Sequence, residues 1–309
     1  MFYTKLLGII KFCGILVIFQ NNWVLSMQID VKLIKAFTQN KEHGNPAGVV
    51  LNADELTDQQ MQEIAENYNF SECVFILKSD KADFKTRFFT PIKEVDFCGH
   101  ATIAAFHCLS KDFLKISASP IVLIQETNKG ILQITCYSDG LIVMQQQDPT
   151  IIDYLIDKSE IANLLGISST DIIGDTQIIS TGTPKLIIPI KSLEALFKIT
   201  PNFTGISEYS LKSGSRGFYP FTTETLDAGS DFHARQFNPL AGINEDPITG
   251  IAAGALGSYI VTHHLSDKKT FVVEQGSIMN KFGKMFVNVT DKILVGGYAI
   301  EFGSEELEV

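Results

Sequence analysis

An internal repeat constrains the fold of this chain more than any other feature of its sequence. RFFTP at residues 87–91 aligns without gaps with RQFNP at 235–239, and IAA at 103–105 aligns with IAA at 251–253, at an offset of 148 residues. Each copy is typical of a strand ending in R-x-F-x-P, a loop, and a helix of small residues without a polar face. Such a helix must be buried. The repeat therefore predicts an α+β fold of two similar β-rich, barrel-like domains, each wrapped around one central helix and related by a pseudo-twofold.

Other patterns agree with a β-rich chain that has few helices. Strands are predicted at residues 49–51, 73–77, 84–89, 121–127, 131–137 and 141–147. A capping box formed by Thr57 and Gln60, with Leu56 placed to pack on Met61, predicts a helix that ends near Asn69. Another helix is predicted at 159–165. The boundary between the domains is predicted near Pro149, giving domains at 27–149 and 150–309, and the last strand is free to return to the first domain.

The first 26 residues differ from the rest of the chain. A basic residue, Lys5, precedes the apolar run LLGIIKFCGILVIF at 6–19, which Lys11 interrupts. This run is shorter than the roughly 20 apolar residues that a membrane-spanning helix needs. We interpret residues 1–26 either as an extension upstream of a folded unit that begins at Met27 or as a signal peptide for export. The folded unit is not expected to contact a membrane.

Charge and cysteine content exclude several classes of function. The formal net charge is −10 and the chain has 45% hydrophobic residues, as expected for a globular protein. Because only three arginines occur and positive charge is not clustered, a nucleic-acid partner is not expected. Five cysteines without a C-x-x-C pair predict neither a disulfide framework nor a zinc ribbon. A reducing, cytoplasmic location is the simplest interpretation.

The two central helices are predicted to begin in turns that suit an anion. Cys98, Gly99 and His100 stand at the first helix start, and the segment 245–250, which contains Asp246 and Gly250, stands at the second. Free N–H groups and the positive end of a helix dipole attract carboxylates. Two such ends facing each other would hold a small acid between them. The alternative is ordinary capping, with Asp246 as N-cap and proline at the first helical position.

Glu72 is a carboxylate at the start of an apolar strand, in NFSECVFIL. Period two places it on the same side as Val74 and Ile76, which favours a pocket over an exposed strand edge. Burial there would raise the pKa of Glu72 and make it usable as a general acid or base near neutral pH.

These residues lie within blocks that resemble a known family. The blocks GNPA, CGHAT, EDPITG and EQG, in this order and spacing from Met27 to the C-terminus, are similar to those of the PhzF (phenazine-biosynthesis-like) family of isomerases. The resemblance implies the fold of diaminopimelate epimerase, a small carboxylate substrate bound between the domains, and no metal or organic cofactor. We further expect a homodimer.

The resemblance also implies roles for individual residues. Its acid/base glutamate falls on Glu72, its histidine on His100 and its aspartate on Asp246. The substrate-binding positions fall on Asn45, Cys98, Gly99, Thr249, Gly250 and Ile251. The family pattern T-G-S-A reads T-G-I-A here, so Ile251 stands where the family has a serine hydroxyl. In the related epimerases, cysteines at both helix starts form the acid/base pair, whereas this chain has Cys98 and Asp246 at those positions.

Three hypotheses of function remain open at this level. The first is an isomerase that moves a proton between carbons of a small carboxylate, with Glu72 carrying the proton and Asp246 and His100 positioning the substrate. The second is a catalytically idle module that binds a small acid or serves as a dimeric partner, which the missing serine at Ile251 favours. The third is an amino-acid epimerase or racemase, which would need a second base opposite Cys98.

Overall fold

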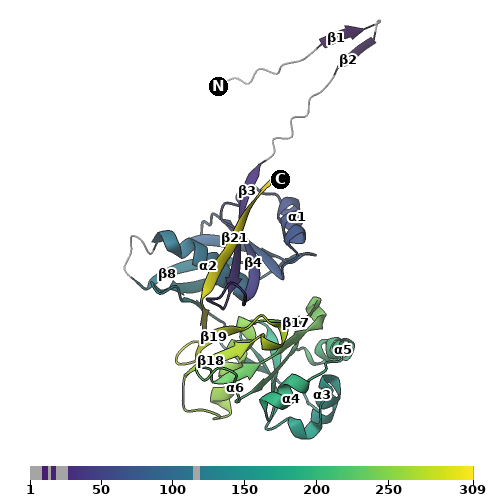
Figure 1. Cartoon of the computed structure of the whole chain (residues 1–309), viewed down its shortest axis with the longest axis vertical. Helices are drawn as coiled ribbons and strands as arrows, with labels where there is room; N and C mark the ends of the chain where they lie inside the picture. Colours follow the sequence, from purple (N-terminus) through teal and green to yellow (C-terminus); the bar gives the residue numbers. More distant parts are fainter. Residues whose placement is uncertain (1–8, 13–14, 19–26, 114–118, 309) are drawn as a thin grey trace.

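The structure is a computed structural model that describes residues 9–12, 15–18, 27–113 and 119–308. It is a mixed fold with a large β-sheet and, within the described residues, six α-helices. These helices are α1 (Asp58–Tyr68), α2 (Gly99–Phe113), α3 (Lys158–Leu165), α4 (Leu193–Lys198), α5 (Phe203–Ser213) and α6 (Gly250–Thr262). Figure 1 shows two lobes stacked along the long axis, with α1 and α2 in one lobe and α3 to α6 in the other.

Strands β3 to β21 form one connected hydrogen-bonded network. Those of the first half, together with the C-terminal strand, are β3 (Gln28–Ala36), β4 (Asn45–Val50), β5 (Glu72–Leu77), β6 (Phe84–Phe89), β7 (Glu94–Val95), β8 (Ile121–Thr127), β9 (Gly130–Cys136), β10 (Ile142–Gln145) and β21 (Ala299–Glu308). Those of the second half are β11 (Thr150–Ile152), β12 (Gln177–Ser180), β13 (Pro184–Pro189), β14 (Phe218–Thr222), β15 (Phe232–Ala234), β16 (Gln236–Asn238), β17 (Ile243–Asp246), β18 (Thr270–Gln275), β19 (Gly283–Asn288) and β20 (Leu294–Gly297).

Two strand pairings connect the beginning of the folded region with its end. β21 lies antiparallel to β3 along its whole length, so that Glu308 pairs with Gln28. β10 pairs with β9 on one side and with β20 on the other, which links the sheets of the two halves. The predicted strands at 84–89 and 121–127 are found with those bounds as β6 and β8.

The sequence repeat is visible in the strand pairing. β6 runs parallel to β8 in the first half, where Phe84 pairs with Gln125. β15 runs parallel to β18 in the second half, where Phe232 pairs with Val273, and both positions are shifted by the 148 residues of the repeat. The arginines of the repeat behave alike as well. Arg87 and Arg235 each bind one glutamate through two nitrogens and each stack on the phenylalanine two residues later. The copies therefore share local structure as well as sequence.

The two helices of the repeat are buried, as their composition predicts. α2 contacts β3, β4, β5, β9, β10 and β21, whereas α6 contacts β12, β13, β19 and β20. Both belong to one hydrophobic cluster that includes Phe106, Met144 and Leu256. Within the described residues no helix is both long enough and apolar enough to cross a bilayer.

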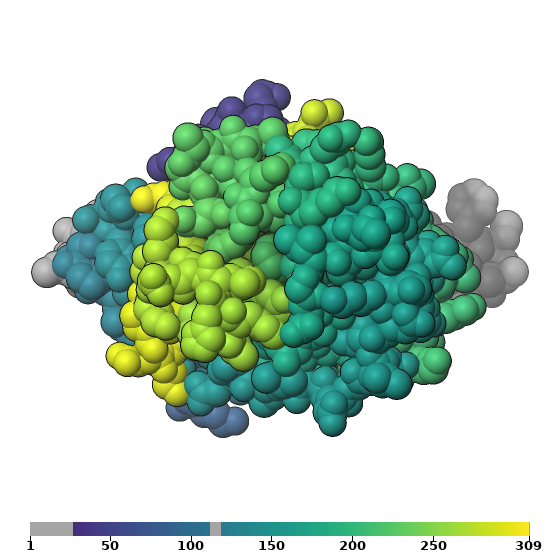
Figure 2. Space-filling model, turned by 90° about the horizontal axis from the view of Figure 1, so that it is seen from below, coloured from purple at the N-terminus to yellow at the C-terminus, as the bar shows by residue number. Residues whose placement is uncertain are grey.

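Further helices cover the outside of the fold. α1 begins at the predicted capping box, where Thr57 and Gln60 bond reciprocally, and its C-cap is Asn69. It contacts β5 and β6, and Met61 and Ile64 belong to an apolar cluster that also includes residues of β3. In the second half, α3, α4 and α5 enclose a separate apolar cluster around Leu196 and Tyr209. Seen from that end in Figure 2, residues of the second half cover most of the visible surface.

The interpretation of residues 1–26 as an extension or leader falls largely outside the described residues. The described parts of this segment are two short strands, β1 (Ile9–Phe12) and β2 (Ile15–Ile18), which pair antiparallel with each other. Continuous pairing with the main sheet starts with β3 at Gln28, next to the Met27 that the sequence indicates as the start of the folded unit.

Candidate active site

The first turns of α2 and α6 converge on one point of the fold. A Cβ atom added to Gly99 would lie 3.1 Å from Met144 Cε, and one added to Gly250 would lie 3.0 Å from the same atom. Both helix starts therefore approach the same side chain at close range. Glycine permits this approach because it has no Cβ atom that would collide with the Met144 side chain.

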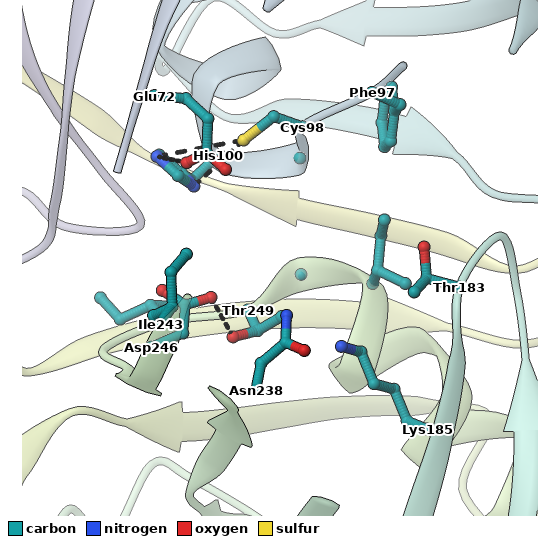
Figure 3. A pocket seen from close by; sticks show the side chains of 14 residues that line it. Glu72, Phe97, Cys98, His100, Thr183, Lys185, Asn238, Ile243, Asp246 and Thr249 are labelled. Atoms are coloured by element: carbon teal, nitrogen blue, oxygen red, sulfur yellow. Dashed lines mark hydrogen bonds and ion pairs between the residues drawn. The ribbon is translucent and has the colours of Figure 1, made fainter. Parts of the chain in front are cut away.

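A cavity of about 130 Å³ lies at this meeting point. It is lined by both helix starts, by the end of β17 and by residues of β5, β13 and β16 (Figure 3). The lining residues are Glu72, Phe97, Cys98, Gly99, His100, Thr183, Lys185, Asn238, Ile243, Asp246, Ile248, Thr249, Gly250 and Ile251.

Three polar side chains of the first half form a cluster at one wall of this cavity. His100 Nδ1 lies 3.3 Å from Cys98 Sγ, and His100 Nε2 lies 3.4 Å from Glu72 Oε2. Glu72 Oε2 is buried and accepts no hydrogen bond from the described residues. A buried oxygen without a donor is costly, so this atom is available to a substrate.

Burial makes this cluster electrically neutral at neutral pH. Loss of hydration, and then the nearby charge of Asp246, raise the pKa of Glu72 to about 8, although a hydrogen bond from Cys98 opposes the shift. Loss of hydration lowers the pKa of His100 to about 4 and raises the pKa of the Cys98 thiol well above its usual value. Glu72 therefore carries a proton near pH 7, whereas His100 does not, and Cys98 is a thiol rather than a thiolate.

Asp246 forms the facing wall and is held by several donors. Its Oδ2 accepts from Thr249 Oγ1 at 2.5 Å, and its Oδ1 accepts from Asn45 Nδ2 at 3.0 Å. The side chain of Gln275 donates to the Asp246 carbonyl at 2.8 Å. Burial raises the pKa of Asp246, while the bond from Thr249 and the charge of Lys185 oppose the shift.

The capping alternative for Asp246 is wrong. Asp246 is the last residue of β17, where it pairs with Gln236, and α6 begins only at Gly250 with Thr249 as N-cap. Its carboxylate instead accepts hydrogen bonds from the side chains of Thr249 and Asn45. In the register of the repeat, α6 thus starts three residues later than α2, which leaves room for Asp246 at the cavity.

Most of the predicted site residues meet at the cavity, with one exception. Asn45 does not line it: the residue is fully buried behind Asp246, and its amide also donates to the Ile248 carbonyl at 3.1 Å. Asn45 opens β4, and the preceding Gly44, with φ of +89°, makes the turn before this strand. A Cβ on Gly44 would lie 2.4 Å from Thr38 Cγ2.

Sequence reasoning missed the polar wall formed by Thr183, Lys185 and Asn238. Lys185 interrupts the apolar run of β13 in the same way that Glu72 interrupts β5, so the argument from strand period was available for it. Asn238 lies inside the second copy of the repeat motif, where the first copy has Thr90.

The neutral cluster also has the composition of a metal site. Glu72, Cys98 and His100 each offer one ligand atom, and these atoms lie within 4.8 Å of one another. A metal ion would need the thiolate form of Cys98 and the carboxylate form of Glu72.

Comparison with known proteins identifies the family. The model of the family described as phenazine biosynthesis-like protein matches residues 34–303. The chain belongs to this family. Among its relatives, the uncharacterised isomerase YfhB of Bacillus subtilis is 36% identical over 270 residues, which cover 85% of this chain and 92% of YfhB. An uncharacterised isomerase of Clostridium acetobutylicum is 37% identical, over 89% of this chain and 96% of that protein. These relatives are named isomerases, which supports the conclusion that this chain is an isomerase too.

Solved structures agree with this assignment. The crystal structure of the Bacillus anthracis phenazine biosynthesis protein of the PhzF family has a TM-score of 0.82 and 32% identity to this chain. The match covers 92% of this chain and 100% of that protein. A hydroxyproline epimerase from Agrobacterium vitis has a TM-score of 0.62 at 9% identity, covering 91% of this chain and 93% of that chain. At that identity the likeness concerns the fold alone.

Proposed function

We propose that this member of the PhzF family is an isomerase that transfers a proton between carbons of a small carboxylate, with Glu72 as the proton carrier and without a metal or organic cofactor. We also infer two barrel-like halves, each around one central helix, with the reaction between them. The observation that carries the proposal is the buried Oε2 of Glu72, which lies 3.4 Å from the neutral His100 and accepts no hydrogen bond from the described residues, in a cavity bordered by two helix starts.

The two helix starts supply the anion site. The first N–H groups of each helix have no partner within the helix. The first backbone bonds at the two starts are donated by Thr102 to the Cys98 carbonyl and by Ala253 to the Thr249 carbonyl. A substrate carboxylate placed there receives backbone N–H donors and the positive ends of two dipoles. The same donors stabilise the additional negative charge that develops when a carbon next to the carboxylate loses its proton.

The proposed reaction then balances without a redox partner. The Glu72 carboxylate accepts the proton of one C–H bond, and the electron pair of that bond moves into the conjugated system that ends at the substrate carboxylate. Glu72 next donates the same proton to a different carbon, and the double bond shifts. His100 and Asp246 hold the substrate during both steps. Because His100 is neutral, it can donate one ring N–H without adding positive charge next to Glu72.

Heavy water provides a test that does not require the product to be known. The protein, incubated in D₂O with a panel of small unsaturated and hydroxylated carboxylates, is expected to incorporate deuterium or to convert the substrate, as followed by NMR. Activity should be unchanged after treatment with EDTA. An idle binding module would show acid-dependent stabilisation but neither exchange nor conversion. Activity lost in EDTA and restored by zinc would assign the cluster of Glu72, Cys98 and His100 to a metal.

The pH dependence of the reaction should follow Glu72. Since only the carboxylate form can accept a proton from carbon, kcat/KM is expected to rise from pH 6 and level off above the Glu72 pKa of about 8. The Glu72→Asp variant should retain this rising limb. Rates measured under single-turnover conditions would check the profile. A fall of kcat/KM over the same range would mean that Glu72 starts the reaction as an acid.

A further inference from the structure

Lys185 is a buried cation in the wall of the candidate active site. Its side chain comes from β13 and is 3% exposed. In Figure 3 the ammonium group points into the pocket between Asn238 and Thr183, on the side away from Glu72. Within the described residues no other lysine or arginine lines this cavity.

The ammonium group is fixed in position but only partly satisfied. Nζ donates to the carbonyl of Arg216 at 2.7 Å, and the Arg216 N–H donates back to the carbonyl of Pro184 at 2.7 Å. Gly217, with φ of +113°, closes this turn, and a Cβ there would lie 2.4 Å from the Phe237 carbonyl. An ammonium has three N–H donors, so Lys185 keeps two that no described group uses.

Lys185 also lacks a carboxylate partner in the described part of the chain. The nearby anion is Asp246, whose charge opposes the fall in the pKa of Lys185 to about 8 that burial causes. The Asp246 oxygens are already taken by Thr249 and Asn45, and the two residues form no ion pair within 4.0 Å. A buried cation without a counter-ion is costly, which is the situation that a bound anion would relieve.

We propose that Lys185 makes the cavity selective for a small dicarboxylate, with one carboxylate at the starts of α2 and α6 and the second on the Lys185 ammonium beside Thr183 and Asn238. This inference rests on the proposed function, because it assumes that the helix starts hold the first carboxylate. It adds the substrate class: the reacting carbons lie between two acid groups, within reach of Glu72 on the opposite wall.

Succinate and butyrate separate the two carboxylate positions, since both have four carbons and differ by one acid group. Titration calorimetry at pH 7 is expected to show succinate binding at least tenfold tighter than butyrate to the wild-type protein. In Lys185→Met, succinate affinity should fall about 10–100-fold, as expected for a lost hydrogen bond between charged groups, while butyrate affinity should be unchanged. Lys212→Met, which removes an exposed lysine of α5, should leave both affinities as they were.

The outcomes distinguish this inference from the proposed function. If the wild type binds both acids equally, or if Lys185→Met weakens both equally, selectivity by Lys185 is wrong while the small-acid site stands. If neither acid binds, the proposed anion site at the helix starts fails as well.

Inorganic phosphate is a further ligand to titrate. Tighter binding of phosphate than of succinate, if it is lost in Lys185→Met, would overturn the assignment to a dicarboxylate. Lys185→Gln, with its thermal midpoint recorded, covers the case in which the methionine variant does not fold.

Discussion

Replacing Glu72 by glutamine is expected to lower turnover by about 10²–10⁴-fold while leaving the affinity for a substrate acid almost unchanged. Glutamine keeps the shape of the side chain but cannot accept and return a proton. The helix starts and Asp246, which we propose to bind the substrate, do not depend on the acid/base function of Glu72. A change confined to kcat, with KM preserved, is therefore the expected signature in steady-state kinetics once a substrate has been identified.

Two controls make this result interpretable. Glu66→Gln, an exposed position on α1, should have wild-type turnover. Folding of Glu72→Gln can be checked by urea denaturation across pH. Because the folded-state pKa of Glu72 is raised to about 8 from an ordinary 4.5, the folded protein binds the proton more tightly than the unfolded chain. Wild-type stability should fall as pH rises through this interval, and the variant should escape that loss.

Full turnover of Glu72→Gln would contradict the proposed mechanism. Cys98 or Asp246 would then have to serve as the base, as in the epimerase-like hypothesis. Cys98→Ser would be the next variant to measure, since the thiol of Cys98 is 3.3 Å from His100 Nδ1. If Cys98→Ser then abolished deuterium uptake, the thiol would take over the role that we assign to Glu72.

Local sequence patterns predicted those parts of the fold that depend on neighbouring residues. The capping box at Thr57 and the apolar run of β5 are of this kind. α4 and α5 were not predicted, because their apolar residues are held by a cluster from separate segments rather than by a strong helical period. The start of α6 was misplaced because Asp246 and Pro247 resemble a helix start, while bonds from Asn45 and Thr249 retain Asp246 at the end of a strand.

The candidate site was predictable to the extent that its residues lie in motifs. Glu72 could be proposed because a carboxylate in an apolar strand is unusual. Lys185 has the same kind of environment in β13, yet its place opposite Glu72 depends on how β13 packs beside α6. Asn45 shows the converse: its motif suggested a pocket wall, but its contacts place it behind Asp246. The positions of these two side chains depend on packing between segments that lie far apart in the sequence, and local sequence patterns do not reveal such packing.

The two arginines of the repeat should differ strongly in their contribution to stability, although their motifs are equivalent. Arg235 is 5% exposed. It binds Glu245 through Nε and Nη2, both at 2.9 Å. Its Nη1 donates to the carbonyls of Leu196 and Ile199 at 3.0 and 3.1 Å, at the C-terminal end of α4. Arg87 instead donates to Glu94 and to Asp58, whose side chain is 83% exposed.

Arg235→Met is expected to lower the free energy of unfolding by about 3–5 kcal/mol, because it leaves a partly buried carboxylate and two helix carbonyls without a donor. Both substitutions remove an equivalent contact of the guanidinium with the phenylalanine two residues later, so the difference between the two losses reports the polar groups. Arg87→Met should cost only about 1–2 kcal/mol, since water can replace the arginine at an exposed carboxylate. Urea denaturation of both variants at pH 7 measures the difference, and equal losses would show that the contacts with α4 add nothing to the stability of the fold.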